Sequence, residues 1–165
     1  MRVRFGRVGV GPARDFLSLR AKVRFAPAAA LPDPRGTWKL VERRDAKGAP
    51  LFYAQILGEQ YDPSSSYGWT LKGKRWIFKA AEPIIGAVSK MVIYPARNDP
   101  DAWEVRASTP RGNLNDAVPV PPLALTLILD GLGPSRRCGQ RLFGPPGAPS
   151  PRCSAPSGSG VIGCK

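Results

Sequence analysis

Residue types that commonly carry catalysis are scarce in this sequence. It contains no histidine, which removes the commonest general base and a frequent metal ligand. Asp99 and Asp101 fall in a turn-like stretch, Glu104 stands alone in an alternating strand pattern, and Ser64 has no activating base near it in the sequence. We therefore expect a protein that is not an enzyme and that carries no cofactor and no metal site.

The cysteines are the one set of side chains with evident covalent chemistry. Cys138, Cys153 and Cys164 are separated by fourteen and ten residues. Zinc sites use closer pairs together with histidine or a fourth cysteine, so this spacing favours a disulfide. Cys138–Cys153 and Cys153–Cys164 are the two favoured pairings, each leaving one odd thiol. The alternative is three unpaired thiols in a disordered tail.

A disulfide would also indicate the compartment in which the protein resides. In a segment rich in glycine and proline, closing a loop of about fifteen residues would stabilise the fold by about 3 kcal/mol in the chain-entropy model. Disulfides persist in oxidising compartments, so we expect a secreted or periplasmic protein. An organelle-targeted or intracellular protein is the alternative.

Aromatic and cationic side chains alternate in the stretch Tyr67–Lys79. Trp69 and Leu71 precede a turn at Gly73, and Trp76 and Phe78 follow it. A period of two on both sides of a glycine-containing turn predicts an antiparallel hairpin. The rest of the chain is expected to be organised around this hairpin.

The hairpin supports more than one interpretation. If the aromatic face is buried, each ring removes about 150–250 Å² from water and anchors the core. If it faces solvent, bases of a single-stranded nucleic acid would stack on the rings. Their phosphates would then contact the cations Lys72, Lys74, Arg75 and Lys79. A protein-binding face is a third interpretation, and burial is the one that we favour.

The net charge of +13 is unevenly distributed along the chain. Residues 1–35 contain eight basic and two acidic side chains, residues 133–165 five basic and none acidic, and residues 36–132 twelve basic and ten acidic. We therefore expect a basic arm or targeting segment (1–35), a β-rich domain (36–132) and a cysteine-containing tail rich in Gly, Pro and Ser (133–165). Basic ends of this kind would bind polyanions without sequence preference.

The N-terminal segment has no uninterrupted apolar stretch of the length that a secretory signal requires. Ala26–Ala30 is similar to the small-residue end of a processing site. A disordered basic arm, an organelle transit segment and a signal peptide with a different start all stay open. No stretch of the chain approaches eighteen consecutive apolar residues, so no transmembrane segment is expected.

Short strand patterns separated by turn signals fill the middle of the chain. They cover residues 36–43, 51–57, 69–79, 84–94, 102–108 and 123–129. Six to eight short strands with turns about every ten residues predict a mainly β protein, with a single antiparallel domain that is barrel-like or a sandwich. The N- and C-terminal segments are expected to be irregular.

Gly36-Thr37-Trp38, which opens the first of these patterns, resembles the start of a lipocalin-like β-barrel. In that family a Gly-x-Trp places an indole across the closed end of the barrel, beside a basic residue near the last strand. Arg136 or Arg137 is in a suitable position for that basic residue. The resemblance implies an apolar internal cavity that binds a small ligand.

We therefore expect non-catalytic binding of a small apolar ligand or a protein partner. The residues expected to contact a ligand are Trp38, Phe52, Tyr53, Trp69 and Trp76. The alternative is a basic nucleic-acid or ribonucleoprotein accessory protein that binds RNA or DNA through both basic arms and the 67–79 hairpin.

Overall fold

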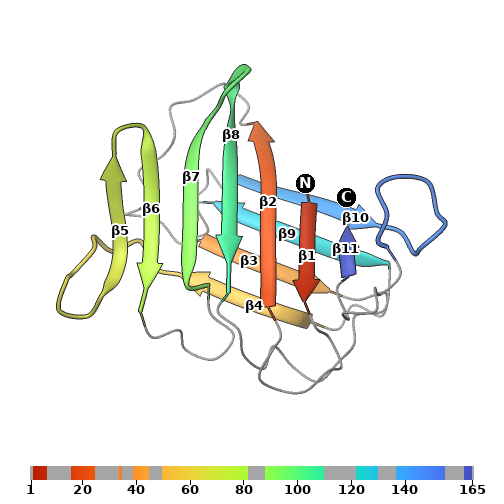
Figure 1. Ribbon diagram of the computed structural model, residues 1–165, viewed down its shortest axis with the longest axis horizontal. Helices are drawn as coiled ribbons and strands as arrows, with labels where there is room; N and C mark the ends of the chain where they lie inside the picture. Colours follow the sequence, from red (N-terminus) through yellow and green to blue (C-terminus); the bar gives the residue numbers. More distant parts are fainter. Residues whose placement is uncertain are drawn as a thin grey trace.

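Eleven β-strands form two antiparallel sheets (Figure 1). The structure is a computed structural model, and it describes residues 2–6, 16–24, 34, 39–44, 50–81, 88–109, 122–129, 137–154 and 162–164. Within these residues no helix has both the length and the apolar character needed to span a membrane.

The large sheet has seven strands, in the order β11-β1-β2-β8-β7-β6-β5. Their bounds are β1 Arg2–Gly6, β2 Phe16–Arg24, β5 Tyr67–Lys72, β6 Arg75–Ala80, β7 Lys90–Ala96, β8 Asp99–Ser108 and β11 Ile162–Cys164. Strands β5 to β8 follow one another in the chain and pair in sequence. On the other side of β8 the sheet continues with β2, which comes from the N-terminal part of the chain.

The small sheet has four strands, in the order β10-β9-β3-β4. Their bounds are β3 Lys39–Arg44, β4 Pro50–Ile56, β9 Leu123–Leu129 and β10 Arg137–Phe143. It lies against one face of the large sheet, and its strands run across those of the large sheet (Figure 1). We call the opposite face of the large sheet its outer face.

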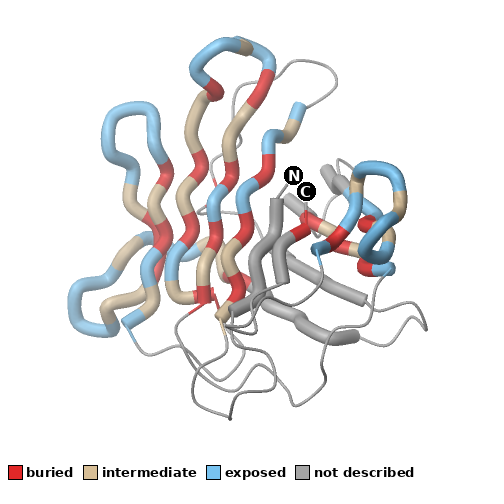
Figure 2. Tube along the Cα trace, turned by 45° about the vertical axis from the view of Figure 1, so that its right-hand side comes forward, coloured by how far each residue is buried: buried red, intermediate tan, exposed pale blue. Residues whose placement is uncertain are grey.

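One hydrophobic core lies between the two sheets. The large sheet contributes Leu17, Leu19, Met91, Ile93 and Val105 among others, and the small sheet contributes residues such as Ile56, Leu125 and Phe143. Buried and more exposed residues alternate along β2, β6 and β7, as Figure 2 shows. This alternation is typical of a sheet with one dry and one wet face.

The expected fold class is confirmed: the protein is mainly β, with antiparallel strands. Its described strands form a sandwich of two separate sheets rather than one closed barrel. The hairpin within 67–79 is present as β5 and β6, with Gly73 at a φ of 57° in the turn. The apolar pattern over 84–94 corresponds to β7, which begins at Lys90, and residues 82–87 lie outside the described part of the chain.

The N-terminal segment differs from the irregular basic arm expected from its composition. Residues 16–24 form β2, which pairs with both β1 and β8. Leu17, Leu19 and Ala21 are buried in the core, whereas Arg20 and Lys22 alternate with them and are exposed. The charged residues are frequent because this strand has one wet face, and they do not prevent it from joining the sheet.

The C-terminal segment also contains regular structure. Residues 137–143 form β10 at one edge of the small sheet, and residues 162–164 form β11 at one edge of the large sheet. Phe143 is buried in the core. The tail is therefore attached to the body through a strand of each sheet.

Candidate functional site

The two tryptophans of the hairpin lie in the core. Trp69 is 0% exposed, its Nε1 donates a hydrogen bond to the carbonyl oxygen of Leu57 at 3.2 Å, and its ring centroid lies 5.4 Å from that of Phe78. Trp76 is 7% exposed. The favoured interpretation of the hairpin, burial of its rings, is confirmed for these residues. Leu71 lies directly opposite Trp76 and on the same side of the hairpin as the buried rings. It is nevertheless 52% exposed.

The other residues expected to contact an apolar ligand are not brought together by the described part of the structure. Trp38 lies outside the described residues, as does Arg136. Phe52 and Tyr53 belong to β4 and pair in register with β3, but their side chains are outside the description. An apolar ligand at these positions, and the lipocalin-like resemblance, stay predictions.

Cations gather instead on the outer face of the large sheet. The set, which we call the cationic face, consists of Arg20, Lys22, Arg24, Lys72, Arg75, Lys79, Lys90 and Arg106. They come from β2, β5, β6, β7 and β8, and all are exposed. Each lies at a position that alternates with inward-facing core residues, so the strand period brings the charges to a single side.

The strand register sets like charges directly opposite one another. Arg20 of β2 pairs with Arg106 of β8, Lys79 of β6 pairs with Lys90 of β7, and Lys72 of β5 pairs with Arg75 of β6. Like charges at directly opposite positions destabilise a sheet. These three pairs are a cost to folding that an anionic ligand would offset, although Glu104 already reduces it for the two arginines that it contacts.

Two carboxylates neutralise part of this face. Asp99 accepts hydrogen bonds from Lys22 at 2.8 Å and from Arg24 at 2.7 Å. The hydrogen bond from Lys22 has the largest effect, followed by that from Arg24, and both lower the pKa of Asp99 below its ordinary value. Asp99 therefore stays ionised and holds the two cations at one end of the face.

Glu104 occupies a central position on the face. It accepts a 2.6 Å hydrogen bond from the Tyr94 hydroxyl, one of 2.9 Å from Arg20 and one of 3.4 Å from Arg106. The bond from Tyr94, followed by the contacts with Arg20, lowers the pKa of Glu104. Burial, with a smaller contribution from Glu104, raises the pKa of Tyr94.

Two guanidinium groups lie over the ring of Tyr94. The Arg75 Cζ lies 5.6 Å and the Arg106 Cζ 5.3 Å from the centroid of its ring. Both distances are within the range of a cation–π interaction. The ring thus orients cations on the face and is itself partly buried.

Four cations of the face have no carboxylate partner among the described residues: Lys72, Arg75, Lys79 and Lys90. Three of the four hairpin residues predicted to contact phosphates, Lys72, Arg75 and Lys79, thus belong to the cationic face. Lys74 is exposed in the turn. Sequence reasoning missed Arg20, Lys90 and Arg106, although the alternation of apolar and charged residues over 16–22 was a usable signal.

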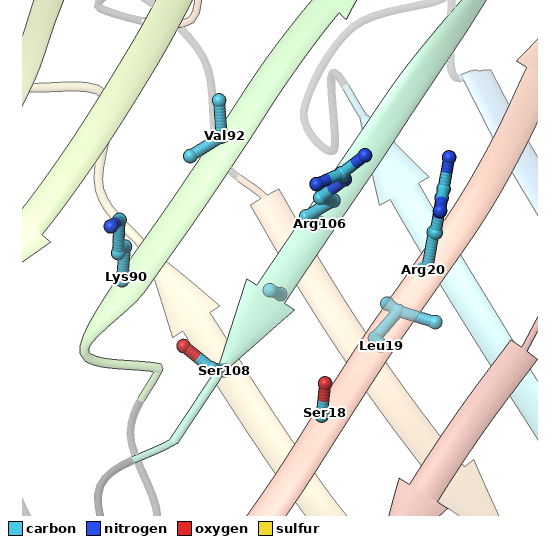
Figure 3. Close-up of a pocket in the computed structure, with 8 residues that line it drawn as sticks. Ser18, Leu19, Arg20, Lys90, Val92, Arg106 and Ser108 are labelled. Carbon is cyan, nitrogen blue, oxygen red and sulfur yellow. The ribbon is translucent and has the colours of Figure 1, made fainter.

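A shallow depression of about 310 Å³ lies among these cations (Figure 3). Its lining consists of Ser18, Leu19, Arg20, Lys90, Val92, Arg106, Ala107 and Ser108. The residues belong to β2, β8 and β7, so we call it the β2–β8–β7 depression. It combines three cations and two hydroxyl groups around one hollow.

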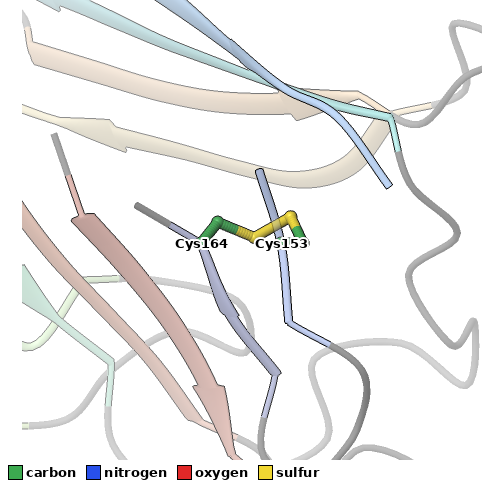
Figure 4. The surroundings of a disulfide bond; sticks show 2 residues. All are labelled: Cys153 and Cys164. Atoms are coloured by element: carbon green, nitrogen blue, oxygen red, sulfur yellow. A yellow bond between two sulfur atoms is a disulfide. The ribbon is translucent and has the colours of Figure 1, made fainter. Parts of the chain in front are cut away.

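The C-terminal segment is closed by a disulfide between Cys153 and Cys164 (Figure 4). This is one of the two pairings that the spacing favoured. Both cysteines are buried, and Cys153 donates a backbone hydrogen bond to Gly144 at 2.9 Å. Cys138 lies in β10 opposite Ile128, and its side chain is outside the described residues.

Comparisons with known proteins add no family to this description. No family model matches the chain, and neither a curated protein nor a solved structure matches it.

Proposed function

We propose that this protein is a secreted or periplasmic, non-catalytic domain that binds a linear acidic polysaccharide on the cationic face. The observation that carries the proposal is the set of like-charged register pairs on neighbouring strands: Arg20–Arg106, Lys79–Lys90 and Lys72–Arg75. An extended anion bound along the sheet would relieve their repulsion.

The extent of the face favours a polymer over a small ion. Neighbouring strands are about 4.8 Å apart, so the four steps from β2 to β5 span about 19 Å. Eight cations and the carboxylates Asp99 and Glu104 are spread over this width. A chain with anionic groups at regular intervals would contact several of the cations at once, which raises its apparent affinity.

The arrangement of aromatic rings favours a polysaccharide over a single-stranded nucleic acid. Base stacking requires open rings beside the cations. Trp69 and Trp76 are buried, and Tyr94 is flanked by Arg75 and Arg106. The Cys153–Cys164 disulfide supports an oxidising compartment, where acidic polysaccharides are encountered.

Other partners remain as predictions from the sequence. A small apolar ligand, a protein partner, and RNA or DNA bound through the N- and C-terminal segments are each distinguishable from the proposed function by direct binding. The proposal differs from them in its contact residues, which are outward-facing cations and not tryptophans.

The test is a binding titration of the full-length protein with dextran sulfate, carboxymethyl dextran, neutral dextran and single-stranded DNA. We expect both acidic dextrans to bind, neutral dextran not to bind, and affinity to fall as salt screens the charges. Failure of both acidic dextrans to bind at low salt would overturn the proposal. Tighter binding of the DNA than of either polysaccharide would do the same and favour the nucleic-acid alternative.

A further inference from the structure

Building on the proposed function, we infer that the β2–β8–β7 depression is a subsite for a single tetrahedral ester group, sulfate or phosphate, of the bound polysaccharide. The cationic face as a whole would attract any polyanion. The depression adds neutral hydroxyl donors to the charges, and this combination discriminates between kinds of anion.

The donors are arranged in two adjacent rows across the sheet. Ser18 pairs with Ser108, which in turn pairs with Lys90 on the next strand. Two residues further along β2, Arg20 pairs with Arg106. Hydroxyl, ammonium and guanidinium groups from three strands therefore line the hollow. In the close-up the side chains of Arg20 and Arg106 extend along their strands away from Ser18 and Ser108 (Figure 3).

These donors retain capacity for a ligand. Within the described residues the hydroxyl groups of Ser18 and Ser108 make no hydrogen bond, and Lys90 has no carboxylate partner. Arg20 and Arg106 each direct one guanidinium nitrogen to Glu104. Since a guanidinium has five N–H donors, both arginines keep donors for a second acceptor.

The number of donors favours a tetrahedral oxyanion over a carboxylate. A sulfate ester presents three terminal oxygens directed to different sides, whereas a carboxylate presents two oxygens in one plane. Three oxygens can accept from the serine row, the arginine row and Lys90 together. A carboxylate would leave part of the set without an acceptor.

The charge of the surroundings does not separate sulfate from phosphate. Three cations, Arg20, Lys90 and Arg106, line the hollow, and the carboxylate Glu104 contacts the two arginines. A phosphate monoester carries about −1.5 to −2 charges at pH 7, and the excess of cations attracts it at least as strongly as a singly charged sulfate ester. Both esters present three terminal oxygens to the donors.

The test uses dextran sulfate, dextran phosphate and carboxymethyl dextran of equal chain length and equal anion content. The wild-type full chain should bind dextran sulfate and dextran phosphate each at least about threefold more tightly than carboxymethyl dextran. The S18A/S108A variant removes the hydroxyls without changing the net charge. It should weaken the binding of dextran sulfate and dextran phosphate at least about tenfold, the scale of one hydrogen bond to a charged group, and leave the affinity for carboxymethyl dextran unchanged.

T70V is the matched control, because Thr70 occupies an outer-face position on β5 outside the depression. It should bind all three polymers as the wild type does. Affinity for both dextran esters equal to that for carboxymethyl dextran, or an equal loss of all polymers in S18A/S108A, would overturn the subsite. In those cases the proposed function stands, whereas binding of no polymer would overturn both.

Discussion

At the scale of single residues, Glu104 controls the charge of the cationic face. It is the acceptor shared by Tyr94, Arg20 and Arg106, so it orients two of the cations and partly neutralises them. An arriving anion therefore meets prepositioned guanidiniums together with one competing carboxylate. A substitution of Glu104 can measure whether orientation of the arginines or repulsion of the anion has the larger effect on affinity.

Replacing the carboxylate with its neutral isostere should strengthen polyanion binding. E104Q keeps an acceptor for the Tyr94 hydroxyl and removes the negative charge beside Arg20 and Arg106. We expect the affinity for dextran sulfate to rise about three- to tenfold, the effect of one nearby charge at a partly screened surface. Unchanged or weaker binding in a titration calorimetry experiment would contradict the role assigned to Glu104.

Asp99 and Glu104 make the free energy of unfolding depend on pH, so that it decreases on acidification. The pKa values of Asp99 and Glu104 in the folded protein lie below the ordinary values of 3.8 and 4.5. Their stabilising contribution is thus complete above those values and is lost as pH falls through the lower, folded-state values. Urea unfolding should show a decreasing free energy of unfolding below about pH 4.

D99N provides the comparison for this pH dependence. Asparagine cannot ionise, so the variant lacks the contribution of the bonds from Lys22 and Arg24 at every pH. Its free energy of unfolding should decline less steeply on acidification than that of the wild type. Parallel pH profiles for the two proteins would contradict the conclusion that ionised Asp99 contributes to stability.

At the scale of elements, β2 joins the N-terminal part of the chain to the core. Its inward residues Leu17 and Leu19 are each 1% exposed, and its outward residues supply part of the cationic face. The backbone N–H of Leu17 also donates to the Thr109 hydroxyl at 2.8 Å. One strand therefore provides both packing and charge.

Truncating an inward residue of β2 should destabilise the whole domain. L17A removes a buried side chain, and the expected loss is about 2–5 kcal/mol in the free energy of unfolding. L71A makes the same chemical change at a position that is 52% exposed and should cost about 1 kcal/mol or less. Equal, small losses in chemical denaturation would show that β2 does not belong to the core.

The elements that the sequence predicted best are those formed by neighbouring segments. The β5–β6 hairpin could be predicted because its alternation and its turn at Gly73 lie within a few residues. The pairing of β2 with β8 could not, because Arg20 and Glu104 are separated by 84 positions along the chain. Local periodicity finds a strand, but it does not choose the strand's neighbours or show which cations will share a face.

The candidate site could be predicted only in part for the same physical reason, since its residues come from strands distant in the sequence. Residues 67–79 were singled out as a mixture of rings and cations, and the rings proved to be buried. Lys79 of the hairpin lies opposite Lys90 only because β6 is placed beside β7. The depression depends on three strands, so no single stretch of sequence displays it.

At the scale of the whole molecule, the disulfide connects the end of the chain to the segment that follows the small sheet. Cys164 lies in β11 of the large sheet, and Cys153 follows β10 by ten residues. With a sequence separation of 11, the bond should stabilise the fold by about 3 kcal/mol in the chain-entropy model. It thereby limits separation of the edge strand β11 from the rest of the tail.

The state of the cysteines can be read from the intact mass. Purified without reductant and alkylated under denaturing conditions, the protein should gain one alkyl group, and after reduction it should gain three. The C153S/C164S variant should unfold at a lower denaturant concentration than the wild type. Three alkyl groups without prior reduction would contradict the disulfide and remove the support for an oxidising compartment.

The location of the positive charge, as distinct from its amount, determines where a polyanion would bind. Two variants that each lose three positive charges separate the effect of location from that of net charge. They are R20Q/K90Q/R106Q on the cationic face, and K74Q/R97Q/R141Q at exposed positions elsewhere. In dextran sulfate titrations at one fixed salt concentration, the first should bind at least about thirtyfold more weakly than the wild type, and the second within about threefold of it. An equal loss of affinity in the two variants would contradict the assignment of the outer face of the large sheet as the binding surface.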